Sequence, residues 1–151
     1  MVEIKKILCC VDLSDFSPAV ADYAVSLAKR FEAGVLFAYV APSLSQYVGF
    51  HVPPSSIDSF VNEIVAGAEG AMNKFIAEHC QGASCQGRII TGYAAEEILA
   101  LAASEKFDMI VMGTHGRKGI DRILFGSVAE KVVKSAKCPV LTIRPSEPRQ
   151  D

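Results

Sequence analysis

The chain has 151 residues, of which 50% are hydrophobic and 21% are charged, and its net charge at pH 7 is −2. This size and composition are typical of one globular domain with its own core. The slight acidic balance excludes a protein that binds nucleic acid through a general basic excess. No stretch is long and apolar enough to span a membrane, and the apolar run after Lys5 and Lys6 is too short for a signal peptide.

The N-terminal part of the chain has the pattern of a strand, a helix and a second strand. An apolar run over 4–11 predicts a buried parallel strand that ends at Asp12. Ser17-Pro18 is typical of a helix N-cap followed by proline, and Gly34 is expected to close this helix. The apolar residues 35–40 predict the second strand, so this unit is typical of a parallel sheet.

Further strands and helices are expected after an irregular loop over 41–56, which is rich in proline and serine. They are, in chain order, a long helix from Ile57 to Ile76, a strand near 85–90 ended by Gly92, a helix over 95–104, a strand over 108–112, a helix from Ser127 and a strand over Pro139–Ile143. Helical spacing places Phe60 on the buried face of the long helix and Val133 on that of the last helix. The sequence predicts a five-stranded, doubly wound α/β domain over 1–145 and a flexible tail over 146–151.

The most informative stretch is 113–128, which reads GTHGRKGIDRILFGSV. It follows a buried strand and leads into Ser127 and Glu130, which have the spacing of a capping box at a helix start. Glycines let the backbone approach a ligand closely, and the first N–H groups of a helix are unpaired. Arg117, Lys118 and Arg122 add positive charge, so the stretch predicts a phosphate-binding loop.

The spacing of Gly113, Gly116, Gly126 and Ser127 resembles the nucleotide-binding signature of the universal stress protein family, in its ATP-binding branch. The similarity extends over nearly the whole chain. It implies a Rossmann-like sandwich of the adenine nucleotide alpha-hydrolase type with strand order 3-2-1-4-5. In that order the strands that end at Asp12 and Gly113 are neighbours at the point where strand order reverses, which is where open α/β sheets bind ligands.

The resemblance also implies roles for individual residues. Val11 and Asp12 would flank the adenosine, Val40 would pack on the adenine, and Met112 with Gly113 would face the ribose and first phosphate. The remaining positions would line the phosphates. The nucleotide-binding residues expected in all are Val11, Asp12, Val40, Met112, Gly113, Thr114, His115, Gly116, Arg117, Gly126, Ser127 and Val128. The implied ligand is ATP, bound together with Mg²⁺.

The sequence predicts a binding protein rather than an enzyme, because the stretch lacks the GxxxxGK[ST], GxGxxG and GxSxG patterns and offers no defensible catalytic base. The expected role is a nucleotide-dependent regulatory switch in a stress response. Three alternatives stay open: a slow ATPase or nucleotide-dependent transferase that uses His115 or Asp121, a nucleotide-free dimeric scaffold, and a protein whose true ligand is AMP or a cyclic nucleotide. The signal and the downstream protein partner are not indicated.

Several of these residues also have an interpretation that needs no ligand. Ser127 is sufficiently explained as an N-cap, Asp12 as a cap of the first helix, and Arg122 as part of a solvated face. Cys80 and Cys85 with His79 lack a fourth ligand for zinc, so they are expected to be ordinary packing or surface residues.

Two expectations concern the cysteines and the last strand. The five cysteines form no CxxC pair, so we expect reduced thiols in a cytoplasmic protein, with the adjacent Cys9 and Cys10 on opposite faces of a strand. The strand Pro139–Ile143 is apolar and lies at the sheet edge, where an uncovered strand normally finds a partner. The family resemblance implies a homodimer formed through this strand.

Overall fold

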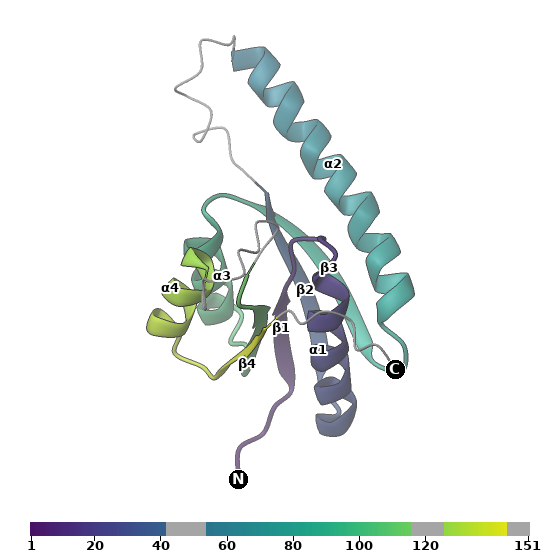
Figure 1. Ribbon diagram of the computed structural model, residues 1–151, viewed down its shortest axis with the longest axis vertical. Helices are drawn as coiled ribbons and strands as arrows, with labels where there is room; N and C mark the ends of the chain where they lie inside the picture. The colour runs from purple at the N-terminus through teal and green to yellow at the C-terminus, as the bar shows by residue number, and fades with distance from the viewer. Residues whose placement is uncertain (42–53, 116–125, 145–151) are drawn as a thin grey trace.

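The computed structural model describes residues 1–41, 54–115 and 126–144. Its strands are β1 (Lys6–Cys10), β2 (Gly34–Ala41), β3 (Ser84–Thr91), β4 (Met109–Gly113) and β5 (Val140–Ile143), and its helices are α1 (Ser17–Phe31), α2 (Pro54–His79), α3 (Ala94–Ser104) and α4 (Ser127–Ser135). The strands form one parallel sheet in the order β3-β2-β1-β4-β5 (Figure 1). The predicted fold class and strand order are confirmed.

Helices cover both faces of the sheet, and alternate residues of each strand enter a different core. In β1, Ile7 and Cys9 pack with α1 and α2, whereas Leu8 packs with α3 and α4. Cys10 contacts the second core, so the prediction that Cys9 and Cys10 lie on opposite faces is confirmed. The period-two alternation of a strand that is buried on both sides explains its nearly continuous apolar sequence.

Helix α2 lies close to β3 because Gly87 has no side chain. A Cβ atom built on Gly87 would lie 2.5 Å from Cγ of Met72 and 2.8 Å from Cδ1 of Ile76, closer than real carbon contacts. Phe75 on the same helix meets Phe37 of β2 edge to face, with ring centroids 5.6 Å apart. The C-terminal half of α2 is therefore the half that closes the core.

The two ends of α1 differ from the prediction by one or a few residues. Phe16 occupies the N-cap and Ser17 is the first helical residue, with Pro18 in the first turn. At the other end, Glu32 is left-handed with φ of 54° and its N–H bonds to the carbonyl of Ala28, so the helix stops before Gly34, which begins β2. A non-glycine residue therefore takes the left-handed position here, and Gly34 is not in the left-handed region.

Two predicted core residues are exposed. Phe60 is 50% exposed, and the N-terminal part of α2 extends beyond the strand ends in Figure 1, where the sheet offers it no surface. Val133 is 45% exposed because the short helix α4 buries the stripe through Ala129 and Val132 instead. Both predictions failed for the same reason, since helical spacing does not say how far a neighbouring surface extends.

The expectation that all cysteines are reduced is wrong for one pair. Cys80, just after α2, and Cys85 in β3 form a disulfide with their Cα atoms 6.4 Å apart, inside the range that a disulfide can bridge. The thiols of Cys9, Cys10 and Cys138 are free. The pairing depends on the turn that brings the strand back beside the helix end, which sequence spacing alone did not reveal.

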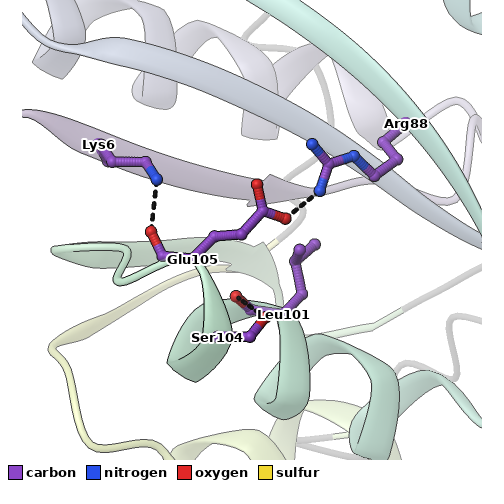
Figure 2. Close-up of polar contacts among 5 residues, drawn as sticks. All are labelled: Lys6, Arg88, Leu101, Ser104 and Glu105. Atoms are coloured by element: carbon purple, nitrogen blue, oxygen red, sulfur yellow. Dashed lines mark hydrogen bonds and ion pairs between the residues drawn. The ribbon is translucent and has the colours of Figure 1, made fainter.

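Polar contacts connect the amino ends of β1 and β4. One carboxylate oxygen of Asp108 accepts the main-chain N–H groups of Lys5 and Lys6, each at 2.9 Å. Figure 2 shows Glu105 at the end of α3 between Lys6 and Arg88, where its carboxylate pairs with the Arg88 guanidinium and its carbonyl accepts from the Lys6 ammonium. These contacts lie at the end of the sheet where the strands begin. The carboxyl ends of the strands therefore remain available for a site.

Within the described residues, none of the helices combines the length and the apolar character that crossing a membrane requires.

Candidate functional site

A cavity of about 410 Å³ lies at the carboxyl ends of β1, β2 and β4. It sits where β1 and β4 are neighbours and the strand order reverses. Every predicted site residue that the structure describes lines it, namely Val11, Asp12, Val40, Met112, Gly113, Thr114, His115, Gly126, Ser127 and Val128. Gly116 and Arg117 lie outside the described residues, as do Lys118, Asp121, Arg122, most of the loop predicted over 41–56 and the predicted tail. The fold thus brings together residues that are about a hundred positions apart in the chain.

Two glycines hold the end of β4 close to the start of α4. The N–H of Gly126 donates to the carbonyl of Thr114 at 2.7 Å, and a Cβ on Gly126 would lie 3.1 Å from that same oxygen. A Cβ on Gly113 would lie 3.3 Å from the carbonyl oxygen of His115. A larger residue at position 126 would push the two backbone segments apart, and one at position 113 would crowd the turn that follows β4, so both glycines serve close backbone approach.

The start of α4 is not the predicted capping box. Gly126 is the N-cap in extended conformation, Ser127 is the first helical residue, and no side chain caps the helix. Glu130 accepts a hydrogen bond from the Lys134 ammonium at 2.7 Å, and this contact lowers the pKa of the Glu130 carboxyl. The glycine N-cap is favoured by its close contact with Thr114, and it moves Ser127 one position into the helix.

This correction changes what the helix start presents to the cavity. Gly126, Ser127, Val128 and Ala129 all line it, and the first N–H groups of a helix have no carbonyl partner within that helix. The Ser127 residue is exposed, and its hydroxyl has no hydrogen-bond partner among the residues described. Unpaired donors with the positive end of a helix dipole form a surface that suits an anion.

Asp12 has a structural role as well as a place in the cavity. Its Oδ1 accepts the main-chain N–H of Ser14 and the hydroxyl of Ser17, both at 3.0 Å. These bonds fix the turn between β1 and α1, but the interpretation of Asp12 as the cap of the first helix is wrong, because Phe16 is the N-cap and no side-chain hydrogen bond caps it. The two roles are compatible because a carboxylate can accept several hydrogen bonds.

Much of the cavity lining is apolar. Val11, Val40, Ile98 and Met112 contribute side chains from three strand ends and from α3. Cys10 also lines the cavity, and burial raises the pKa of its thiol to about 12, so the thiol stays neutral and unreactive near pH 7. A cavity lined both by apolar side chains and by the first residues of a helix is suited to a ligand with a flat apolar ring at one end and an anionic group at the other.

Sequence reasoning missed several residues of the cavity. Phe16, Ser17 and Tyr39 reach it from the first turn of α1 and from β2, and Ala94 with Ile98 reaches it from α3. The position of Ser17 beside Asp12 could have been suspected from their separation across one turn. For Ile98 there was no signal, because local spacing shows that a residue is buried but not which end of the sheet it covers.

Two further features complete the chemistry of the cavity. The Thr114 hydroxyl shares a hydrogen bond of 2.9 Å with Nδ1 of His115, and Thr114 is only 5% exposed. Within the described ranges, no three His, Cys, Asp or Glu side chains are grouped so that they could hold a metal ion. The described residues can therefore bind an anion and an apolar ring, and they offer no preformed metal centre.

A model described as the universal stress protein family matches residues 3–144. The chain belongs to this family. Among curated relatives, Universal stress protein MJ0531 of Methanocaldococcus jannaschii is 39% identical over 143 residues, which are 93% of this chain and 82% of that protein. Among solved structures, universal stress protein UspA from Lactobacillus plantarum has a TM-score of 0.80 at 27% identity, and the match covers 95% of this chain and all of that one.

More distant universal stress proteins with the same fold have been solved with nucleotides. One was solved in complex with cAMP, with a TM-score of 0.61 at 22% identity over 95% of this chain and 98% of that chain. Another, from Archaeoglobus fulgidus, was solved in complex with dAMP, with a TM-score of 0.57 at 21% identity over 94% of this chain and 98% of that chain. At these identities the likeness shows the shared fold.

Proposed function

We propose that this universal stress protein binds ATP in the cavity at the carboxyl ends of β1 and β4 and acts as a nucleotide-dependent regulatory switch in a stress response. The observation that carries the proposal is the first turn of α4, which contributes Gly126, Ser127 and Val128 to a cavity whose lining is otherwise largely apolar. The complexes of two family members with cAMP and dAMP support an adenine nucleotide as the class of ligand.

The placement of the ligand follows from the chemistry of the lining residues. Val40 would pack on the adenine and Met112 would face the ribose, while Asp12 would lie beside the nucleoside rather than the phosphates, because two anions repel each other. The phosphates would lie at the start of α4, near Gly113 and Gly126. One helix N-terminus contributes about 0.3–1 kcal/mol when exposed, so affinity must come from several N–H bonds together with burial of the base.

Magnesium fits this proposal as a companion of the phosphates. The described part of the cavity contributes one carboxylate, Asp12, whose Oδ1 already accepts two hydrogen bonds. Mg²⁺ commonly keeps several waters and binds through nucleotide phosphates with few protein ligands. The ion would therefore neutralise phosphate charge.

The first experiment is isothermal titration with ATP, ADP and AMP, each with and without Mg²⁺. Wild type should bind ATP in the micromolar range. Gly113→Val should abolish binding because its side chain meets the His115 carbonyl and Val20, and Ser127→Ala should weaken it. Thermal unfolding of each variant separates lost binding from lost folding. Failure of wild type to bind any adenine nucleotide would refute the proposal and favour a nucleotide-free scaffold.

We propose that binding, not rapid turnover, is the activity. His115 is the only imidazole that lines the cavity within the described residues, and its Nδ1 is engaged with Thr114. Phosphate release should stay far below the usual turnover of enzymes, which is roughly 1–1,000 per second. Fast hydrolysis that is lost in His115→Ala would instead establish a catalytic role for this histidine.

We further propose a homodimer formed through β5, in the cytoplasm. β5 is an edge strand, so its outer main-chain groups can pair with a second copy, and Val133 on the neighbouring α4 is an exposed apolar side chain. Sedimentation at micromolar concentration tests the dimer, and Thr142→Pro, which removes a main-chain donor on the side of β5 that faces away from β4, should give monomers. A wild-type monomer would contradict it. Fractionation of cells tests the location.

A further inference from the structure

We propose that Ser17 is a positioning residue for the nucleotide: its hydroxyl orients the Asp12 carboxylate so that Asp12 accepts a hydrogen bond from a donor group of the nucleoside. The donor would be a ribose hydroxyl or the exocyclic amine of the base. This inference rests on the proposed function, because it assigns the part of the ligand that one wall of the cavity recognises.

Ser17 is a buried polar residue in a position where serine is usually exposed. It is the first residue of α1 and is only 2% exposed. Its main-chain N–H donates to the carbonyl of Ser14 at 3.0 Å, and its hydroxyl donates to Oδ1 of Asp12 at 3.0 Å. Both donors of this buried residue are therefore used within the turn that carries Asp12.

The Asp12 carboxylate is held from two directions. Oδ1 accepts the Ser14 N–H from the turn and the Ser17 hydroxyl from the helix. Two donors on one oxygen restrict rotation of the side chain, and α1 is a rigid anchor because Val20 and Ala21 bury it against the sheet. A carboxylate offers about four acceptor positions, so this arrangement is compatible with a further donor from a ligand.

The chemistry of a carboxylate selects the part of the ligand. It only accepts hydrogen bonds and repels phosphate, whereas the donors that suit phosphate lie at the start of α4. The neutral donors of an adenine nucleoside are its sugar hydroxyls and its amine. A carboxylate that is already oriented loses little freedom on binding, so its hydrogen bond contributes more to affinity.

The test compares affinities for ATP with those for 2′-deoxy-ATP, 3′-deoxy-ATP and inosine triphosphate, which each lack or replace one donor. Ser17→Ala should weaken ATP binding roughly five- to tenfold and should weaken the analogue that lacks the recognised donor much less. The analogue that responds in this way identifies the donor. Ser14→Ala is the control for the turn itself: the Ser14 hydroxyl accepts the Phe16 N–H at 3.4 Å, but the bond of Ser14 to Asp12 comes from its main-chain N–H, so this variant should weaken ATP binding much less than Ser17→Ala.

A double-mutant cycle separates positioning from direct contact and from a structural effect. In an Asp12→Ala background, which has no side-chain oxygen for Ser17 to orient, Ser17→Ala should cause no further loss, whereas a Ser17 hydroxyl that itself contacts the ligand would still cause one. The inference would be overturned if Ser17→Ala weakened the binding of every analogue as much as that of ATP, or if it did not weaken ATP binding. Either result would leave the proposed function intact. A wild-type protein that binds no nucleotide would refute both, so the two failures are distinguishable.

Discussion

The disulfide between Cys80 and Cys85 should stabilise the protein measurably although it closes a short loop. The two residues are separated by 5 positions. If the bond acts by restricting the unfolded chain, closing a loop of this length contributes about 2 kcal/mol at 25 °C. For a chain of this size, a loss of 1 kcal/mol in the free energy of unfolding lowers the thermal unfolding midpoint by about 2–4 °C. Reduction of the disulfide should therefore lower the midpoint by about 4–8 °C.

The assay is thermal unfolding followed by circular dichroism, with and without dithiothreitol. Wild type should lose its extra stability in the reductant, and Cys85→Ser should show the lower midpoint in both conditions. Cys138→Ser is the control, since the Cys138 thiol is free and its loss should leave the response to reductant unchanged. The reasoning would be refuted if the reductant did not change the thermal midpoint of wild type and if Cys80 and Cys85 could both be alkylated in the native protein.

Three further predictions concern packing, pH and thiol reactivity. Gly87→Ala should lower the free energy of unfolding in urea by about 1–3 kcal/mol, because the added Cβ would overlap α2. Gly70→Ala is the control, since the space around Gly70 on α2 is open, and it should raise this free energy by about 0.5–1 kcal/mol. An unchanged stability of Gly87→Ala would show that α2 packs elsewhere. The hydrogen bond from Arg88 lowers the pKa of Glu105 from 4.5, so its contribution is present above pH 4.5 and is lost as pH falls through the lowered pKa. Glu105→Gln should therefore lose less stability than wild type on acidification below that pH, and parallel pH curves would contradict this. Both Cys10 and Cys138 are half-buried, and burial raises the pKa of Cys10 to about 12 and also raises the pKa of Cys138. Iodoacetamide at pH 8 should therefore label Cys138 before Cys10, as peptide mass spectrometry would show, and equal labelling of the native protein would contradict the larger shift at Cys10.

The strands and their faces could be predicted because they depend on local pattern. Each apolar run in the chain became a strand within a few residues of its predicted limits, and the neighbours Cys9 and Cys10 point to opposite sides of β1. Helix ends were less predictable. Ser17 and Ser127 both look like N-caps in the sequence, but each is the first helical residue, because a preceding residue takes the cap position.

The candidate site could also be predicted only in part. Its glycines and Asp12 could be predicted, since close backbone approach and the carboxyl end of a strand leave a clear pattern in the sequence. Ile98 could not, because it lies on a helix that is buried for reasons of packing and reaches the cavity only through the position of α3. The bond between Ser17 and Asp12 also depends on how the turn folds.

The alternation of strands and helices and the glycine-rich stretch after β4 could be read from spacing and residue type along the chain, and the strand order followed from the family resemblance. The disulfide between Cys80 and Cys85, the exposure of Phe60 and the N-cap of α4 at Gly126 became known only from the folded domain. Each of these depends on the distance between segments that are not bonded to each other, and such distances are set by packing of the whole domain rather than by any local pattern.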